Sequence, residues 1–109
     1  MTACVLVIAG SDSGGGAGIQ GDIKTITSLG GFATTAITAL TAQNTQGVQA
    51  IRSVSSNLIK MQIDSIVEDF PINTIKLGML HSEKVIKTVV SSIKKNLKHR
   101  PRPLFKRAI

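Results

Sequence analysis

An apolar run followed at once by a dense cluster of glycines constrains this chain more than any other feature of its sequence. Residues 5–9 are continuously apolar and rich in β-branched side chains, which is typical of a strand covered on both faces. Six of the ten glycines then fall between Gly10 and Gly21. Because apolar residues recur at helical spacing from Ile19 to Leu29, the pattern predicts a strand, a glycine loop and a helix in series.

The same alternation of strand and helix continues along the chain. Residues 32–40 and 74–80 predict two further buried strands, while Ser55 or Ser56 is predicted to cap a second helix and Ser82 a third. Strands that alternate with helices indicate an α/β fold, with three layers and helices on both faces of a mainly parallel sheet. Three strands make a small sheet, so we expect an unpaired edge and a tendency to form homo-oligomers.

The net charge of +7 is typical of a nucleic-acid-binding protein until it is located along the chain. Residues 94–109 hold seven basic and no acidic side chains, whereas residues 1–93 hold six of each. We therefore expect a neutral body and a solvated basic end, without a specific nucleic-acid partner. The alternative is that the basic end binds nucleic acid or an anionic membrane without regard to sequence.

Several other classes of protein are excluded by what the sequence contains. There is no Trp or Tyr, and three Phe residues are too few for a platform on which bases stack. The single cysteine, Cys4, excludes an intrachain disulfide framework and fits a reducing compartment. No stretch approaches the ~20 apolar residues that span a bilayer, and no signal-peptide pattern is present. We therefore expect a cytoplasmic protein with no membrane partner, and because His81 lacks partners at metal spacing we expect no metal site.

The glycine loop over residues 11–18 differs from the known phosphate-binding loops. The letters from Gly16 to Gly21 spell G-x-G-x-x-G, but the predicted strand has already ended at Ala9, and Gln43 and Asn44 stand where a dinucleotide site needs an acid. No Lys-Ser/Thr pair follows the glycines, which excludes a Walker A loop. Two interpretations stay open, namely a flexible surface loop and a wall of bare backbone against which a small ligand packs.

Polar candidates for a site gather where the predicted strands end, which is where open α/β sheets bind ligands. The Asp22 carboxylate can accept from an exocyclic amine and the Gln43 amide can both donate and accept, so together they can recognise the edge of a heteroaromatic ring. Met79 can supply an adaptable apolar surface to such a ring. The plainer alternatives are a helix-dipole residue for Asp22, a solvated residue of the polar stretch 41–47 for Gln43, and a core residue for Met79.

Four motifs carry a resemblance to a known family: I-A-G-S-D-S-G-G-G-A-G-I-Q from residue 8, D-I-K-T from residue 22, I-T-A-L-T-A-Q-N-T from residue 37 and K-L-G-M-L from residue 76. Together they resemble the hydroxymethylpyrimidine/phosphomethylpyrimidine kinases of thiamine biosynthesis. The resemblance implies a ribokinase-like fold and two successive phosphorylations by ATP, with Mg²⁺, of 4-amino-5-hydroxymethyl-2-methylpyrimidine and its monophosphate. It also implies which residues bind the pyrimidine substrate, namely Gly10, Ala17, Gly18, Asp22, Gln43 and Met79.

The resemblance implies further segments that this sequence does not show. Family members are longer, have a strand ending in Val-Asp-Pro-Val-Met where this chain has residues 103–109, and hold their nucleotide-binding segments and catalytic residue farther on. We therefore expect residues 1–98 to be the substrate-binding part of a ribokinase-like domain, interrupted by truncation or a frameshift, and residues 99–109 to be a divergent basic tail. No catalytic residue is expected, so the chain should bind substrate at most. The alternatives are a non-catalytic pyrimidine-binding remnant and a fragment of a pyridoxal- or pyridoxine-type kinase.

Overall fold

The computed structural model describes residues 2–97 and 104–107 and contains one mixed sheet with helices on both faces. The sheet order is β3-β2-β1-β4-β5, in which β3 is antiparallel to β2 and the other neighbours are parallel. The predicted α/β class with a mainly parallel sheet is therefore confirmed. In chain order the elements are β1 (Cys4–Ser11), α1 (Gly18–Ser28), β2 (Phe32–Asn44), β3 (Gly47–Ser53), α2 (Ser56–Asp69), β4 (Thr74–Leu77), α3 (Glu83–Leu97) and β5 (Leu104–Arg107).

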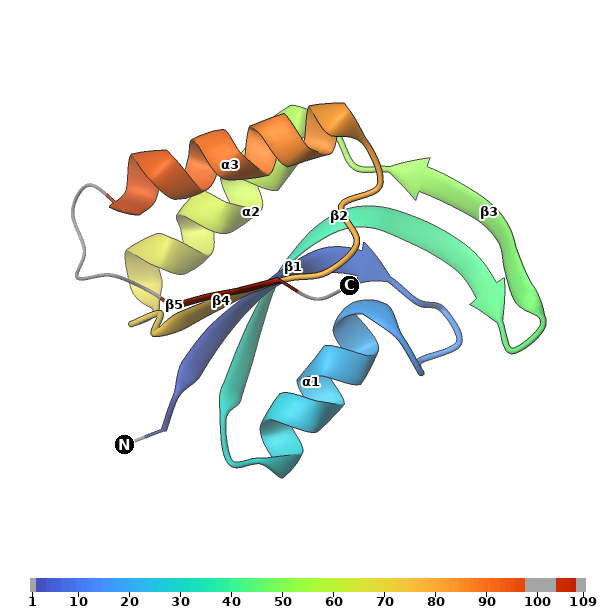
Figure 1. The fold of residues 1–109 in the computed structure, drawn as a ribbon, viewed down its shortest axis with the longest axis horizontal. Coiled ribbons are helices and arrows are strands. Elements are labelled where there is room, and N and C mark those ends of the chain that lie inside the picture. The colour runs from blue at the N-terminus through green and yellow to red at the C-terminus, as the bar shows by residue number, and fades with distance from the viewer. Residues whose placement is uncertain (1, 98–103, 108–109) are drawn as a thin grey trace.

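The helices form a layer on each side of the sheet, with α1 on one face and α2 and α3 together on the other (Figure 1). The chain passes from β1 through α1 to β2, and later returns through α2 to β4 on the opposite side of β1. Both connections between parallel strands are right-handed crossovers, and they run in opposite directions across the sheet. The helices α1 and α2 therefore lie on opposite faces. The strand order therefore reverses at β1, which is where sheets of this kind leave a crevice for ligands.

Most of the apolar core lies between the sheet and the pair α2 and α3. Among the described residues this face holds a cluster of ten buried side chains, of which Ile59 and Ile63 of α2 and Val89 of α3 are at most 1% exposed. The α1 face holds a cluster of three buried side chains. The apolar stripe predicted for α1 is only partly covered, since Ile23 is 37% and Leu29 is 82% exposed. The two faces of the sheet thus differ greatly in how much apolar surface they bury.

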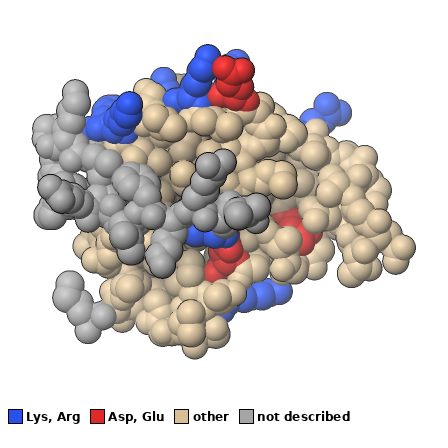
Figure 2. Space-filling view, viewed as in Figure 1, with Lys and Arg blue, Asp and Glu red and all other residues tan. Residues whose placement is uncertain are grey.

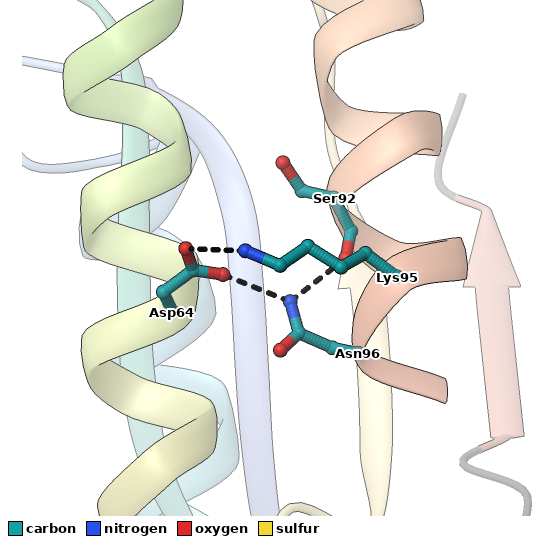
Figure 3. A network of polar contacts seen from close by, with 4 residues as sticks. All are labelled: Asp64, Ser92, Lys95 and Asn96. Carbon is teal, nitrogen blue, oxygen red and sulfur yellow. Dashed lines mark hydrogen bonds and ion pairs between the residues drawn. The ribbon is translucent and has the colours of Figure 1, made fainter. Parts of the chain in front are cut away.

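Side-chain hydrogen bonds define the ends of α2 and α3 and connect the two helices. Ser55 caps α2 by accepting from the Leu58 N–H at 3.2 Å, which decides between the two predicted caps. Between the helices, the Asp64 carboxylate of α2 accepts from Asn96 at 3.0 Å and from Lys95 at 3.3 Å (Figure 3). The hydrogen bond from Asn96, assisted by Lys95, holds the pKa of Asp64 below its usual range.

The second strand is longer than predicted and has a partner that the sequence pattern did not reveal. Residues 41–44 belong to β2, not to a loop, and they pair with the antiparallel β3 from Asn44↔Gly47 to Ala39↔Ser53. All seven residues of β3 are exposed, so the strand shows no alternation of buried and exposed positions. The ends of β2 and β3 curve away from the helices as an arm (Figure 1). The third predicted strand is shorter than expected, since β4 ends at Leu77.

The charged side chains are unevenly distributed over the described surface. Figure 2 shows lysines and arginines along the edge formed by α3, while the arm of β2 and β3 is mostly uncharged.

Residues 98–103 and 108–109, which hold much of the predicted basic tail, lie outside the described residues, so the division at residue 98 stays a prediction. The backbone of β5 pairs in parallel with β4, so three predicted strands become five. In the described part of the chain, no helix is long and apolar enough to cross a membrane.

Candidate functional site

The carboxyl ends of β1, β2 and β4 border a cleft of about 380 Å³. This volume lies in the range of about 300–1,000 Å³ that small-molecule sites usually occupy. The structure brings every residue predicted for the site to this one cleft, although their part in binding stays a prediction. The predicted residues that line it are Gly10, Ala17, Gly18, Asp22, Gln43 and Met79.

The glycine loop that forms one wall of the cleft is shaped by Asp12, a residue that was not predicted for the site. Its Oδ1 accepts from the Gly14 N–H at 2.7 Å, and its Oδ2 accepts from the N–H groups of Gly16 at 3.0 Å and Ala17 at 2.8 Å. These backbone hydrogen bonds, those of Ala17 and Gly14 above all, lower the pKa of the Asp12 carboxyl. The loop is therefore hydrogen-bonded against the cleft, as expected of a backbone wall and not of a flexible surface loop.

Further hydrogen bonds attach the glycine loop to its neighbours. Ser13 Oγ donates to the carbonyl oxygen of Gln43 at 2.7 Å and accepts from the Gln43 N–H at 2.7 Å. On α1, Gln20 Oε1 accepts from the Asp12 N–H at 2.8 Å, while its Nε2 donates to Ser11 Oγ at 2.8 Å. The loop, the end of β2 and the first turn of α1 are therefore held in one fixed arrangement.

Two glycines allow backbone segments to approach closely at the edge of the cleft. Gly18 has φ +57°, and a Cβ built on it would lie 2.4 Å from the carbonyl oxygen of Gly10. A Cβ on Gly78, just after β4, would lie 2.6 Å from Cβ of Ala9. A side chain at either position would force β1 away from its neighbour, so these glycines determine the width of the cleft.

A second charged group of the cleft, Lys76 of β4, was also absent from the predicted site. Its Nζ donates to both carboxylate oxygens of Asp22, at 2.7 and 2.6 Å, and the two side chains are 26% and 21% exposed. Asp22 is therefore half of an ion pair, and it lies beyond the first turn of α1, which holds no acidic residue. The two partners lie 54 residues apart in the sequence, and only the fold brings them together. Because the charges of Lys76 and Asp22 cancel, the pair gives the cleft carboxylate acceptors without adding net charge.

The two remaining predicted side chains, Gln43 and Met79, also line the cleft. Thr41 Oγ1 donates to the carbonyl oxygen of Ser11 at 2.7 Å and lies 3.1 Å from Oε1 of Gln43. Met79 is 82% exposed, which contradicts the alternative that it is a core residue.

His81 also lines the cleft and has a left-handed backbone with φ +76°, an unusual conformation for a residue with a side chain. Its strained backbone could not be foreseen from the sequence pattern.

The glycine loop does not present its N–H groups to the phosphates of a nucleotide. The loop N–H groups that could bind a phosphate already donate to Asp12. Nowhere in residues 2–97 and 104–107 do three or more His, Cys, Asp or Glu side chains gather as metal ligands. The cleft therefore offers its chemistry to a small polar ring, with a backbone wall, an amide, a paired carboxylate and a methionine around it.

Comparison with known proteins gives consistent matches. The family model described as phosphomethylpyrimidine kinase matches residues 12–102. The hydroxymethylpyrimidine/phosphomethylpyrimidine kinase of Rhizobium meliloti is 44% identical over 95 residues, which are 87% of this chain and 36% of the relative. The crystal structure of phosphomethylpyrimidine kinase from Clostridium difficile superposes with a TM-score of 0.85 at 45% identity, covering 88% of this chain and 42% of that one.

More distant kinases share the same architecture. The pyridoxal kinase of Staphylococcus aureus, solved in complex with AMP-PCP and pyridoxal, superposes with a TM-score of 0.75 at 29% identity over 87% of this chain and 35% of that one. These structural matches confirm the predicted ribokinase-like fold over part of the length of such kinases. The chain spans between 16% and 36% of the length of the curated relatives it matches.

Proposed function

The chain belongs to the phosphomethylpyrimidine kinase family, and we propose that its cleft is the pyrimidine-binding site of such a kinase. Kinases of this family use ATP. The proposed activity of the whole enzyme is the phosphorylation by ATP, with Mg²⁺, of 4-amino-5-hydroxymethyl-2-methylpyrimidine and then of its monophosphate in thiamine biosynthesis. The observation that carries the proposal is the convergence of the six predicted residues, which come from three separate stretches of the sequence, on one cleft.

The proposed recognition follows from the polar groups that border the cleft. The exocyclic amine of the pyrimidine donates to the carboxylate of Asp22, whose oxygens keep lone pairs available beside the ammonium of Lys76. The amide of Gln43 recognises the ring nitrogens, since in the described part of the chain no protein group accepts from its Nε2. Met79 covers a face of the ring with a flexible thioether side chain.

We propose that the cleft binds and orients the pyrimidine without transferring a phosphoryl group by itself. Phosphoryl transfer depends on positioning the nucleotide and neutralising charge on the transferred group. In the described part of the chain, the donors of the glycine loop are occupied by Asp12, and no three His, Cys, Asp or Glu side chains gather as metal ligands. Phosphorus NMR of the 109-residue chain with ATP, Mg²⁺ and the pyrimidine should show no phosphorylated pyrimidine above the rate without protein. Turnover that depends on the protein would contradict this part of the proposal.

Calorimetric titration with 4-amino-5-hydroxymethyl-2-methylpyrimidine tests the binding function. Gln43→Ala removes the proposed amide contact, and Gln49→Ala is its matched control, because Gln49 lies on β3 and donates to the carbonyl oxygen of Gly47. We expect roughly two- to tenfold weaker binding for Gln43→Ala, since one hydrogen bond contributes about 0.5–1.5 kcal/mol, and unchanged binding for Gln49→Ala. No heat from the unmodified chain at millimolar ligand, or equal effects of the two variants, would reject the proposal.

A pyridoxine-type alcohol is the second candidate substrate, favoured by the structural matches to pyridoxal kinases. Pyridoxine has no exocyclic amine on its ring, so the Asp22 carboxylate has no such group to accept from. Asp22→Asn should therefore weaken binding of the aminopyrimidine more than binding of pyridoxine. Tighter binding of pyridoxine than of the aminopyrimidine by the unmodified chain would favour the second candidate.

A further inference from the structure

Backbone N–H groups of the glycine loop converge just before α1, as they do in loops that hold phosphate. Here the place of the anion is taken by a side chain of the protein itself. We propose that Asp12 is a built-in anion that fills this cradle, excludes phosphate from the glycine-loop end of the cleft and so selects uncharged groups there. Asp12 is thereby a specificity-determining residue. Because Asp12 occupies these donors, this glycine-rich loop of a kinase-like fold does not hold the phosphates of a nucleotide.

The contacts of the Asp12 carboxylate leave no room for a second anion among the same donors. It accepts three backbone N–H bonds of 2.7–3.0 Å, and the residue is only 7% exposed although it borders the cleft. A Cβ on Gly14 would lie 3.2 Å from its Oδ1, so the loop backbone is folded tightly around the carboxylate. An entering phosphate would have to displace the carboxylate from these donors and would meet its negative charge.

The backbone that surrounds the carboxylate is also held from the side of α1. The Asp12 N–H donates to Gln20 Oε1 at 2.8 Å, and Lys24 Nζ donates to the carbonyl oxygen of Gly15 at 2.8 Å on the outer side of the loop. The positive charge of Lys24 further favours the ionised carboxyl. The built-in anion therefore stays ionised and fixed at neutral pH. If the proposed function holds, the uncharged ring lies against the loop, and the phosphate of a phosphorylated ligand points away from it.

Titration with inorganic phosphate, followed by amide NMR, tests the role of Asp12 without any pyrimidine. In the unmodified chain, phosphate should leave the amide signals of Gly14, Gly16 and Ala17 in place. In Asp12→Ala the vacated donors should respond, with an apparent Kd for phosphate at least tenfold below the highest concentration at which the unmodified chain shows no response. Asp64→Ala is the matched control, since it removes an equally charged, hydrogen-bonded carboxylate from the opposite face of the sheet, and it should behave like the unmodified chain.

Two results would overturn the proposal. One is a phosphate response at these loop amides in the unmodified chain, a measurement that needs no variant to fold. The other is a folded Asp12→Ala variant, in which the three loop donors are vacated, whose loop amides do not respond to phosphate. Because the probe is phosphate alone, either failure is distinct from a failure of pyrimidine binding, which would reject only the proposed function.

Discussion

The two faces of the sheet are built by different means. On one face, α2 and α3 enclose a cluster of ten buried apolar side chains, and Asp64 of α2 accepts hydrogen bonds from Asn96 and Lys95 of α3 (Figure 3). On the other face, α1 encloses a cluster of three, and the glycine loop, α1 and strand ends are joined by hydrogen bonds and one ion pair. The cleft belongs to this second face and to the strand ends beside it.

This difference assigns separate tasks to the two faces. Apolar burial is strong and insensitive to direction, so the α2 and α3 face supplies most of the stability. Hydrogen bonds contribute less each but demand particular distances and directions, so the α1 face determines the shape of the site. Substitutions on the first face should therefore change the free energy of unfolding, and those on the second should change ligand binding.

The largest effect on stability is expected from Ile63→Ala on α2. Ile63 is 1% exposed in the main cluster, so its truncation should lower the free energy of unfolding by about 2–5 kcal/mol, measured by urea denaturation. Leu58→Ala on the same helix, where the side chain is 48% exposed, should cost about 0.5 kcal/mol or less. The folded fraction of Ile63→Ala should bind the pyrimidine normally, and a loss of binding by that fraction would break the division between the faces.

Gly18→Ala should affect both stability and binding. Its φ of +57° and the 2.4 Å approach of a Cβ to Gly10 predict a loss of about 1–3 kcal/mol and a displaced cleft wall. Gly30→Ala is the control, since Gly30 also has a positive φ of +86° but no atom within 4 Å of its Cβ position. We expect it to cost about 1 kcal/mol and to bind the pyrimidine normally. Equal binding by both variants, measured by calorimetry, would show that Gly18 has no role beyond its backbone conformation.

Lys76→Met should change binding more than stability. Removing the ammonium frees the Asp22 carboxylate from its fixed position, so the affinity for the pyrimidine should fall several-fold while the free energy of unfolding changes by about 1 kcal/mol or less. Lys95→Met removes the corresponding partner of Asp64, and it should leave both quantities nearly unchanged because that lysine is 71% exposed. A normal affinity in Lys76→Met would contradict a positioning role for the ion pair.

The smallest effect concerns the dependence of stability on pH. The backbone hydrogen bonds from Ala17, Gly14 and Gly16 lower the pKa of Asp12 in the folded chain below the value of about 3.9 expected when unfolded. The carboxylate thus contributes stability that is complete above that value and is lost as pH falls through the folded pKa. The difference in unfolding free energy between the unmodified chain and Asp12→Asn should shrink in this acidic range, as urea denaturation at several pH values would show. A difference independent of pH would mean that the charge is not what stabilises the loop.

The local parts of the fold could be predicted because short sequence patterns determine them. The buried strand at residues 5–9, the glycine loop and the caps Ser55 and Ser82 were recognisable from apolar spacing and capping residues. The strand β3 was not, because it is entirely exposed and exists through its pairing with β2. Propensity and periodicity carry little information about a strand of this kind.

The candidate site was predictable to a similar extent. The six predicted residues lie at or just beyond the carboxyl ends of strands or near the start of α1, positions that topology brings together. Lys76 was not singled out, because its partner Asp22 is distant in sequence and an internal lysine of a strand gives no local signal. Asp12 is different, since an aspartate two residues before a glycine cluster is a known pattern of local side-chain-to-backbone bonding and could have drawn attention to it.

Amide NMR during titration with 4-amino-5-hydroxymethyl-2-methylpyrimidine tests the central claim most directly. If the hydrogen-bonded face carries the site, the signals that move should be those of the cleft, above all Gly10, Gly18, Gln43 and Gly78. The amides of α2 and of the described α3 residues should stay in place. A ligand that moves the α2 and α3 signals while leaving the cleft unchanged, or that moves no signal at millimolar concentration, would contradict the account.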